Sequence, residues 1–456
     1  MYDLKGKKVL IIGLARSGIA VAKAALLLGA EICGYDKKAI TEIDPEAISV
    51  FSSSPCRLLA GGAEPREDER WDLIVMSPGV PSDLPFIANA VSKGAELIAE
   101  IELAWRLSRA KYVAITGTNG KTTTTALTGE IFINSGMTAK VAGNIGIPAV
   151  SESLDPSMDE NAWLIAEVAC LQLETTRVFR PVISALLNIT PDHLDRFISM
   201  ENYVAAKSKI IENQGPEDYF VVNMDDSIAW TLTRKCKARI VPFSSKKRLE
   251  YGAFIDSGKI VFVDSDKGLT EFCEIDELRI SGLHNLENAL AAAAIAFIAG
   301  IPAEIIGDSL RRFRGVEHRQ ETVETINGVR FINDSKGTNV DAAIKAIEAI
   351  QSDIILIAGG YDKHASYDGF IDAFDGKVKH LLLMGTTALR IRSAALAKGF
   401  TRITLCENMK ECVNKGFELA ADGDTVLLSP ACASWDMYSC FEERGEDFRS
   451  CVRELE

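Results

Sequence analysis

The feature that most restricts the fold of this chain is a repeated alternation of short apolar runs with helical patterns. In the first segment, apolar runs at residues 8–12, 31–35 and 73–77 predict strands, and an apolar stripe over residues 17–28 predicts a helix. Strands that alternate with helices are typical of parallel sheets with helices on both faces. We therefore predict an α/β fold that begins with a Rossmann-like unit.

The same alternation recurs twice more along the chain. The strands predicted in these two segments, with an Ala-rich helix between them, are residues 112–115, 163–168, 182–188, 329–332, 354–358, 381–384 and 425–428, and the helix is 285–299. The chain has 456 residues, more than one hydrophobic core usually serves. We therefore predict three domains, over residues 1–108, 109–313 and 314–456, of which the first and the last are Rossmann-like.

Composition and charge exclude several classes of protein. The fractions of 47% hydrophobic and 25% charged residues are those of a soluble globular protein, and no apolar run reaches the roughly 18 residues of a membrane span. The polar residues 1–8 leave no room for a signal peptide, and the ten cysteines include no Cys-x-x-Cys pair. The net charge of −14 argues against broad nucleic-acid binding. We expect a cytoplasmic monomer with reduced cysteines, no nucleic-acid partner and no membrane insertion.

The strongest local motif is a glycine-containing turn between a short strand and a helix that begins near Lys121. Its glycines let backbone N–H groups converge on phosphate oxygens, with the N-terminus of the helix behind them. Lys121 would neutralise the β and γ phosphates, and the Thr122 hydroxyl would bind Mg²⁺. The loop residues predicted to bind ATP are Gly117, Thr118, Asn119, Gly120, Lys121, Thr122 and Thr123.

The spacing of this motif differs from the usual pattern G-x-x-x-x-G-K-[ST]. Ile115 stands at the first glycine position, and Gly117 follows two residues later. A turn that contains Gly and Lys for structural reasons alone is the alternative. With its flanking strand and helix, the motif favours a central P-loop-type ATP-binding domain.

Polar side chains follow two more of the predicted strands of this domain. Glu167 follows the apolar run 162–166, and His193 lies in the polar segment 188–195. The carboxyl ends of parallel strands face the crevice in which such sheets bind ligands. Glu167 is a natural Mg²⁺ ligand because Mg²⁺ prefers oxygen, whereas a histidine at such a place is more often a hydrogen-bonded structural residue. Lys207 has, by its pattern, the character of a solvated helix lysine.

The N-terminal motif GLARSG at residues 13–18 supports a competing hypothesis, an NAD-dependent dehydrogenase. With Asp36 after the next strand, the motif resembles a dinucleotide fingerprint. Ala15 replaces the second glycine, at which the backbone must approach a pyrophosphate closely. Dinucleotide binding is therefore disfavoured, and a purely structural glycine turn is the other alternative.

Taken together, the motifs resemble those of the Mur ligase family, whose members use ATP to activate a carboxylate as an acyl phosphate and then form an amide. The resemblance covers all three segments. Its most specific parts are TGTNGKT at residues 116–122, GNIG at 143–146, Glu167 with LQLE at 171–174, the polar segment 188–196, NDSKGTN at 333–339 and LSPACAS at 428–434. Folylpolyglutamate synthetases share the ATP chemistry but lack the N-terminal UDP-binding unit. The non-catalytic alternative is a nucleotide-binding regulatory protein, in which Glu167, His193 and Lys207 would have no role.

The resemblance implies roles that the pattern alone does not assign. Asn288 would face the adenine of ATP, and Arg319 and Asp334 would complete the nucleotide site. Two Mg²⁺ ions are implied, as is a carbamate that CO₂ forms on one lysine. The implied metal-binding residues are Thr122, Glu167, His193 and Lys207, the last of which is the carbamylated one, and the implied catalytic residues are Lys121, Glu167, His193 and Lys207.

The resemblance also implies two small-molecule substrates, a UDP-linked carboxylate and D-glutamate. The UDP-substrate residues would be Arg16, Ser17, Asp36, Lys37, Ser77, Gly79, Asn144 and His193. Family members often carry Thr in place of Ser17 and a Thr-Arg pair after the acidic residue, whereas this chain has Lys37-Lys38. The D-glutamate residues would be Lys336, Thr338, Lys363, Ser434 and Phe441. Lysines and hydroxyls suit a substrate with two carboxylates.

Within the family, residues 333–338 favour a member that adds D-glutamate. Members that add alanine, diaminopimelate or lysine usually carry a Tyr-Ala-His type segment at this place. The implied reaction joins D-glutamate to UDP-N-acetylmuramoyl-L-alanine through an acyl phosphate, yields ADP and phosphate, and belongs to peptidoglycan precursor synthesis.

Overall fold

The computed structural model describes residues 2–52, 56–81, 83–144, 146–192, 194–266, 268–280, 282–361 and 365–455, apart from the side chains of residues 194 and 195. The chain forms two compact units. The first consists of Met1–Ile189, Ser199–Glu277 and Glu287–Arg311, and the second of Thr190–Ile198, Leu278–Leu286 and Arg312–Glu456.

The N-terminal part of the first unit is a five-stranded parallel sheet in the order β3-β2-β1-β4-β5. The run Val9-Leu10-Ile11-Ile12 is buried throughout, as expected for a central strand covered on both faces. The strands are β1 (Lys8–Ile12), β2 (Glu31–Tyr35), β3 (Arg57–Leu59), β4 (Leu73–Met76) and β5 (Glu96–Ala99). The helices are α1 (Arg16–Leu27), α2 (Pro45–Phe51), α3 (Pro85–Ser92) and α4 (Glu100–Leu107).

The remainder of the first unit is built on a nine-stranded sheet in the order β14-β13-β12-β11-β10-β9-β6-β8-β7. Strands from β7 to β12 in this order pair in parallel, whereas β12, β13 and β14 form an antiparallel extension. The strands are β6 (Lys111–Thr116), β7 (Ala139–Gly143), β8 (Trp163–Glu167), β9 (Ile183–Leu186), β10 (Tyr219–Asn223), β11 (Arg239–Ser244), β12 (Gly252–Asp256), β13 (Lys259–Asp264) and β14 (Gly268–Glu274).

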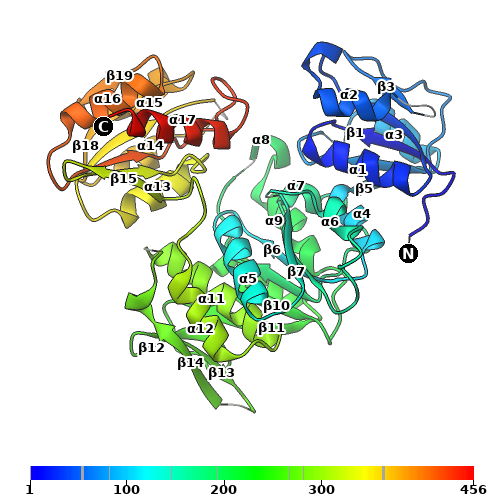
Figure 1. Cartoon of the computed structure of the whole chain (residues 1–456), viewed down its shortest axis with the longest axis horizontal. Coiled ribbons are helices and arrows are strands. Elements are labelled where there is room, and N and C mark those ends of the chain that lie inside the picture. Colours follow the sequence, from blue (N-terminus) through cyan, green and yellow to red (C-terminus); the bar gives the residue numbers. More distant parts are fainter. Residues whose placement is uncertain are drawn as a thin grey trace. The chain divides into compact units, whose positions relative to one another are not determined.

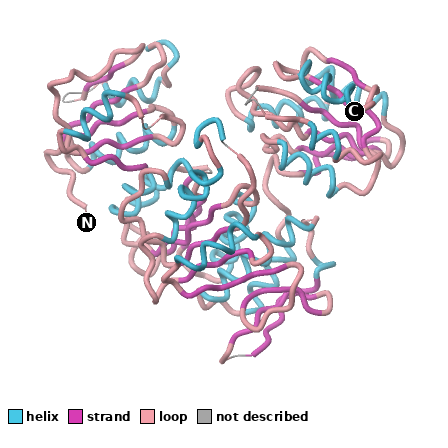
Figure 2. The backbone as a smooth tube through the Cα atoms, turned by 180° about the vertical axis from the view of Figure 1, so that it is seen from behind, coloured by secondary structure: helices cyan, strands magenta, loops and turns pink. Residues whose placement is uncertain are grey.

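Helices flank the strands of this sheet (Figures 1 and 2). They are α5 (Lys121–Asn134), α6 (Ala149–Ser153), α7 (Cys170–Leu173), α9 (Met200–Ser208), α10 (Ser227–Thr231), α11 (Leu283–Ile298) and α12 (Ala303–Arg312). The Ala-rich stretch of α11 is buried from Ala289 to Ala296. Small side chains on all sides let this helix be surrounded by neighbouring elements.

The second unit contains a six-stranded sheet in the order β15-β16-β20-β17-β18-β19, parallel except for the β15–β16 pair. Its strands are β15 (Glu321–Ile326), β16 (Val329–Asn333), β17 (Ile354–Ala358), β18 (Val378–Leu383), β19 (Ile403–Leu405) and β20 (Thr425–Leu428). Its helices are α8 (Leu194–Phe197), α13 (Val340–Ala349), α14 (Asp368–Asp372), α15 (Ala388–Ala397), α16 (Met409–Leu419) and α17 (Phe441–Arg453).

Two hydrophobic cores lie on opposite faces of this sheet. Ile354, Leu356 and Ala358 of β17 belong to the core that α13, α14 and α15 cover. Ile355 and Ile357 belong to the core of α16 and α17. The alternation follows from the two-residue period of a strand, so β17 is apolar at every position because both faces are covered.

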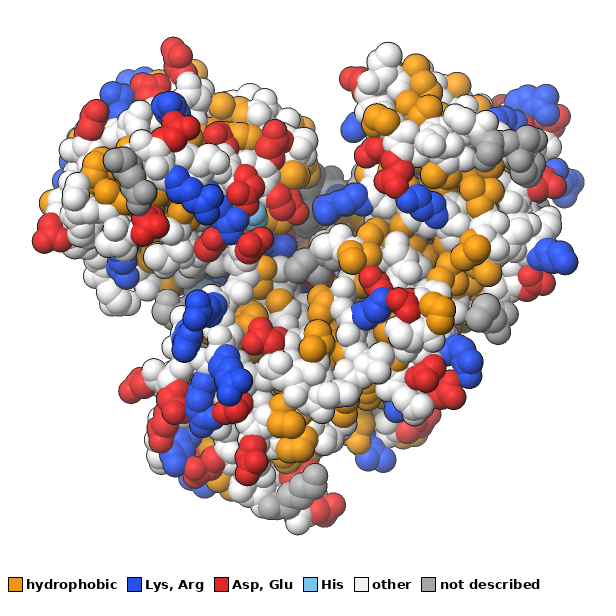
Figure 3. Space-filling view, viewed as in Figure 1, with side chains coloured by type: hydrophobic (Ala, Val, Ile, Leu, Met, Phe, Trp, Pro, Cys, Tyr) orange, Lys and Arg blue, Asp and Glu red, His pale blue; other side chains and the backbone are white. Residues whose placement is uncertain are grey.

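The predicted α/β fold is confirmed, and each of the three predicted segments contains one sheet. Strands β3, β5, β7, β10 to β15 and β19 were not predicted, and the boundaries at 108/109 and 313/314 stay predictions. Within the described part of the chain, no helix is both long enough and apolar enough to cross a membrane. On the face that Figure 3 shows, acidic and basic side chains are interspersed.

Candidate active site

The glycine-containing turn connects β6 to α5, as the sequence predicts. Two backbone N–H groups of the turn are fixed by Asn188, which follows β9. The Thr118 N–H donates to the Asn188 carbonyl at 3.0 Å, and the Asn119 N–H donates to Asn188 Oδ1 at 2.8 Å. Gly120 has a φ of 84° and lies so close to Asn288 that a Cβ atom would overlap its Oδ1. Glycine is required there for both reasons.

Two lysine side chains meet at the carbonyl oxygen of Gly117. Lys121 Nζ donates to it at 3.0 Å and to the Thr118 carbonyl at 2.8 Å. Lys207 Nζ, from α9, donates to the Gly117 carbonyl at 2.8 Å, although Lys207 is only 1% exposed. The Lys121 side chain beside a helix N-terminus makes the turn attractive to a phosphate group.

The burial of Lys207 corrects the pattern-based expectation of a solvated helix lysine. Tyr203, one helical turn earlier, was not predicted as a site residue. Its ring lies 4.8 Å from Lys207 Nζ, and its hydroxyl is 3.0 Å from Thr118 Oγ1. The four-residue spacing that places both side chains on one face of α9 was the available signal.

Glu167 ends β8 next to the turn, because it pairs with Ile115 across the sheet. It is 1% exposed and accepts a 3.0 Å hydrogen bond from Asn144 Nδ2. A Cβ atom on Gly143 would overlap the Glu167 carbonyl oxygen, so glycine permits the close approach of β7. The structure therefore brings Asn144 and Glu167 together.

The residues at this edge fit a magnesium ion. A buried carboxylate, that of Glu167, and a buried hydroxyl, that of Thr122 in the first turn of α5, are hard oxygen donors. Mg²⁺ usually takes one or two carboxylates and completes its shell with phosphates and water. The predicted ligand His193 lies outside the described residues. Among those that the structure describes, no three His, Cys, Asp or Glu side chains form a metal-binding group.

Asn288 of α11 lies against the glycine turn. Its Oδ1 accepts a 3.2 Å hydrogen bond from Thr124 Oγ1, and the side chain is buried. The structure thus places Asn288 beside Gly120, at the start of α5. Its predicted contact with adenine stays a prediction.

Six of the predicted UDP-binding residues lie at the carboxyl edge of the N-terminal sheet, whereas Asn144 lies beside Glu167 in the central sheet. Arg16 and Ser17 begin α1, and Ser77 Oγ donates to the Gly13 carbonyl at 2.8 Å. The Asp36 carboxylate accepts hydrogen bonds from the Leu14 N–H at 2.9 Å and from the Lys38 N–H at 3.0 Å. Asp36 therefore fixes the glycine turn. These two hydrogen bonds are equally consistent with a purely structural turn. Lys37 and Gly79 follow β2 and β4 in the same loops.

Asp334 follows β16 in the C-terminal sheet and is 1% exposed. It accepts hydrogen bonds from Ser429 Oγ at 2.7 Å and from the Gln320 N–H at 3.3 Å. Burial raises the pKa of the Asp334 carboxyl to about 6, and the charge of Arg319 opposes this rise. The structure thus brings Asp334 within the electrostatic influence of Arg319, the other predicted nucleotide residue of this sheet.

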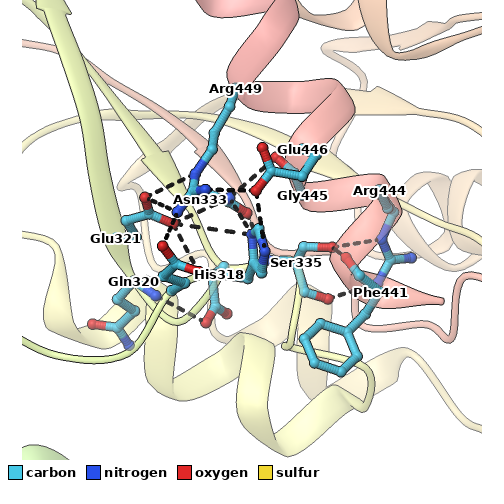
Figure 4. A network of polar contacts seen from close by, with 12 residues as sticks. His318, Gln320, Glu321, Asn333, Ser335, Phe441, Arg444, Gly445, Glu446 and Arg449 are labelled. Atoms are coloured by element: carbon cyan, nitrogen blue, oxygen red, sulfur yellow. Dashed lines mark hydrogen bonds and ion pairs between the residues drawn. The ribbon is translucent and has the colours of Figure 1, made fainter. Parts of the chain in front are cut away.

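A network of polar contacts holds the backbone on both sides of Arg319 (Figure 4). His318 and Gln320 have φ angles of 60° and 46°, which non-glycine residues rarely adopt. Asn333 Nδ2 donates to His318 Nδ1 at 2.9 Å, and the His318 N–H donates to Glu321 at 2.8 Å. The network stabilises the strained backbone and so fixes the place from which Arg319 extends.

The predicted D-glutamate residues gather beside this network. Lys336 Nζ lies 4.8 Å from the centre of the Phe441 ring, and Ser335 Oγ donates to the Phe441 carbonyl at 2.7 Å. Thr338 follows in the same loop, while Ser434 lies in the loop after β20 and is 2% exposed. Strands β16 and β20 are parallel neighbours, so both loops leave the same edge of the sheet. Lys363 lies outside the described residues.

The predicted residues therefore form three groups, one at the carboxyl edge of each sheet. The central sheet provides the phosphate-binding turn and the oxygen donors that suit magnesium. The N-terminal sheet provides a turn that contains serine and arginine, and the C-terminal sheet provides a lysine over an aromatic ring, with hydroxyl groups nearby. Such groups suit binding of a nucleoside triphosphate, a second phosphate-bearing ligand and an anion.

Comparison with known proteins gives matches over most of the chain. A model of the Mur ligase middle domain matches residues 115–296, and a model of the Mur ligase, glutamate ligase domain matches residues 318–432. The UDP-N-acetylmuramoylalanine–D-glutamate ligase of Thermoanaerobacter sp. (strain X514) is 48% identical over 455 residues and covers 99% of each chain. The ligase of the same name from Clostridioides difficile (strain 630) is 44% identical and covers 99% of this chain and 100% of the relative.

Solved structures with low sequence identity share the fold. UDP-N-acetylmuramate-alanine ligase MurC from Thermotoga maritima has a TM-score of 0.63 at 18% identity and covers 99% of this chain and 100% of that protein. MurF ligase from Thermotoga maritima in complex with ADP has a TM-score of 0.60 at 15% identity, with 99% and 96% covered.

Proposed function

The chain belongs to the Mur ligase family, and we propose that it is the member that joins D-glutamate to UDP-N-acetylmuramoyl-L-alanine, with conversion of ATP to ADP and phosphate. The observation that carries this proposal is similarity of 44–48% identity, over 99% of the chain, to ligases named for this reaction. The three groups of polar residues support it, because the reaction needs sites for ATP, a UDP-linked carboxylate and an amino acid.

The first step requires the carboxylate of UDP-N-acetylmuramoyl-L-alanine to attack the γ phosphate of ATP. Both reactants are anions, so cationic side chains must offset their repulsion. We propose that Lys121 exchanges its bonds to the Gly117 and Thr118 carbonyls for bonds to phosphate oxygens. Residues 117–123 would bind the remaining oxygens, chiefly through the N–H groups of residues 120–123, because the Thr118 and Asn119 N–H groups already donate to Asn188.

Bound Mg²⁺ would polarise the phosphoryl oxygens and neutralise charge that develops during transfer. Thr122 and Glu167 would hold the first ion, with His193. We further propose that Lys207 reacts with CO₂ as a neutral amine, which forms an N–C bond and releases one proton. The resulting carbamate is an anion that can act as a ligand for a second ion, and the proximity of Lys207 Nζ to the turn supports this role.

In the second step the nitrogen of D-glutamate attacks the acyl carbon, and phosphate leaves. We propose that Lys336 and Lys363 bind the two carboxylates of D-glutamate, while Thr338 and Ser434 donate hydrogen bonds and Phe441 packs against the carbon chain. The position of Lys336 over the Phe441 ring supports this arrangement, since both side chains then border one site. Charge-assisted hydrogen bonds of this type are the stronger ones.

We propose that each predicted domain serves one substrate. Residues 1–108 would bind UDP through Arg16, Ser17, Asp36, Lys37, Ser77 and Gly79, with Asn144 near the reacting end. Residues 109–313 would bind ATP, with Asn288 at adenine. Residues 314–456 would bind D-glutamate and complete the nucleotide site with Arg319 and Asp334.

We also propose that the protein acts in the cytoplasm, as a monomer. Its substrates ATP and a UDP-linked sugar belong to that compartment. The ten cysteines, all free thiols, are consistent with a reducing environment.

Release of phosphate tests the proposed reaction. We expect release only when ATP, Mg²⁺, UDP-N-acetylmuramoyl-L-alanine and D-glutamate are all present. L-alanine and L-lysine should not replace D-glutamate, and folate-type acceptors should not replace UDP-N-acetylmuramoyl-L-alanine. An equal rate without the amino acid would instead indicate an ATPase, and a preference for another amino acid would reject the proposed specificity.

A further inference from the structure

Arg444 in α17 is buried to an unusual degree for an arginine. It is 2% exposed, and its guanidinium lies between the loops that follow β16 and β20. Its sequence pattern does not indicate burial, since an arginine in a helix rich in charged residues has the pattern of a solvated side chain. The structure shows that it belongs to the interior of the C-terminal domain.

The guanidinium is hydrogen-bonded to residues that directly precede two proposed D-glutamate contacts. Nε donates to Ser335 Oγ at 3.0 Å and Nη2 donates to the Ser335 carbonyl at 2.7 Å, immediately before Lys336. Nη1 donates to the carbonyls of Cys432 and Ala433, both at 3.2 Å, immediately before Ser434.

Two further segments depend on the same contacts. Ser335 Oγ donates to the Phe441 carbonyl, so the start of α17 is joined to the loop of Lys336. The Ala433 carbonyl also accepts the Tyr361 N–H at 2.9 Å, at the end of the segment that leads from β17 toward Lys363. A Cβ atom on Gly360 would overlap this carbonyl and approach Arg444 Nη1 to 3.2 Å. Arg444 thus joins α17 directly to two loops and, through the Ala433 carbonyl, to the segment that ends at Tyr361.

The charge of Arg444 has no direct counter-ion within the described part of the chain. Its acceptors are carbonyl and hydroxyl oxygens, and it takes part in no ion pair there. Burial lowers the pKa of Arg444 to about 10, so the guanidinium still carries its charge at neutral pH. The carboxylates of Asp334 and Asp436 favour this charge without bonding to it, and a buried cation that lacks a direct carboxylate partner favours the approach of a further anion.

We propose that Arg444 is a positioning residue for the amino-acid substrate: it holds the loops of Lys336 and Ser434 and the start of α17 in register, and its charge favours the approach of a dicarboxylate. This inference rests on the proposed function of the same site. Arg444 itself does not touch the substrate in this role, because its donors are already bonded to the loops.

The test compares Arg444→Gln and Arg444→Lys with a matched variant, Arg449→Gln. Arg449 lies on the same helix and forms ion pairs with Glu321 and Glu446, but bonds to neither D-glutamate loop. The readouts are Tm, kcat and the KM values for D-glutamate, ATP and UDP-N-acetylmuramoyl-L-alanine. ADP–ATP exchange in the presence of the UDP substrate reports the first step without D-glutamate.

We expect Arg444→Gln to raise KM for D-glutamate roughly tenfold or more, because charge-assisted hydrogen bonds of the loops are lost. KM for ATP and ADP–ATP exchange should change little. Arg444→Lys keeps the charge but not the four bonds and should show a smaller rise. Arg449→Gln should lower Tm and leave KM for D-glutamate unchanged. If Arg444 had a purely structural role, its variants would likewise lower Tm without a specific rise in KM for D-glutamate.

Ser335→Ala provides a second test, since it removes the hydroxyl that accepts from Arg444 Nε and donates to the Phe441 carbonyl. We expect a folded protein with a raised KM for D-glutamate. A wild-type KM for D-glutamate in Ser335→Ala together with unfolded Arg444 variants would overturn the proposal, as would Arg444 variants that lower only kcat. If the wild-type protein uses a different amino acid, the proposed function fails. The proposed role of Arg444 is then tested by the effect of its variants on KM for that amino acid.

Discussion

At the scale of single residues, the Gly117 carbonyl is the point at which two lysines converge. Lys121 and Lys207 donate to it at 3.0 and 2.8 Å. Spacing identified Lys121 through the glycine-containing turn, but it gave no reason to select Lys207, whose place depends on the packing of α9 against the turn. Arg444 was missed for the same reason, because burial of a charged helix residue is decided by tertiary contacts.

Lys207→Ala should remove most of the ligase activity, because the proposed carbamate would be lost with its metal ligand. A short carboxylic acid such as acetate should restore part of the activity by supplying the missing carboxylate. Lys209→Ala is the control, since Lys209 Nζ donates to the Glu174 carbonyl at 2.7 Å and not to the turn. Steady-state phosphate release measures both variants, and full activity of Lys207→Ala would reject the carbamate.

The raised pKa of the Asp334 carboxyl predicts that the free energy of unfolding depends on pH. Burial raises its folded-state pKa to about 6, whereas an unfolded aspartate has a pKa of about 3.9. Between these values folding binds a proton, so the group stabilises the fold by about 3 kcal/mol below pH ~4. This contribution is lost as the pH rises through about 6.

Asp334→Asn lacks this titration. The Tm of the variant relative to wild type should therefore rise from about pH 5 to about pH 8. Asp368→Asn, an exposed position of the same domain, is the control. Thermal unfolding followed by circular dichroism gives both differences, and a pH-independent difference for Asp334→Asn would contradict the raised pKa.

At the scale of elements, the junction between β6 and α5 depends on glycine at its last turn position. Gly120→Ala introduces a left-handed alanine, which costs about 1 kcal/mol or more, and a Cβ that overlaps Asn288 Oδ1. We expect a lower Tm and a raised KM for ATP. Gly136→Ala, just beyond the other end of α5, has a similar φ of 81° but open space around its Cβ.

The two alanine variants therefore share the backbone strain and differ in the overlap. We expect Gly136→Ala to lower Tm by less and to leave KM for ATP unchanged. Equal effects of the two substitutions on KM for ATP would show that contact with Asn288 does not shape the turn.

The ten strands that the sequence predicts are all present and agree with the structure to within a few residues. β1, β2, β17 and β20 begin and end at the predicted residues, because continuous apolar runs bounded by turn residues mark strands that are buried on both faces. The parallel strands β3, β5, β7, β10, β11 and β19 and the strands β12 to β15 were missed. β15 has mostly exposed positions and β14 several, so neither shows the apolar run that identified the others.

At the scale of the whole molecule, each sheet carries its polar group at its carboxyl edge, as expected for parallel α/β sheets. The family resemblance assigned a substrate to each group, whereas pattern alone identified the phosphate-binding turn and Glu167 as a magnesium ligand. Roles such as those of Asn288 and Lys336 could not be derived from spacing, since they depend on which loops a parallel sheet places side by side.

The most direct test of the proposed function follows one oxygen atom through the reaction. UDP-N-acetylmuramoyl-L-alanine labelled with ¹⁸O in its carboxylate is incubated with ATP, Mg²⁺ and D-glutamate, and the released phosphate is analysed by mass spectrometry. Attack of the carboxylate on the γ phosphate, followed by attack of the amine on carbon, predicts one labelled oxygen in each phosphate released. Unlabelled phosphate alongside amide formation would contradict the acyl-phosphate mechanism.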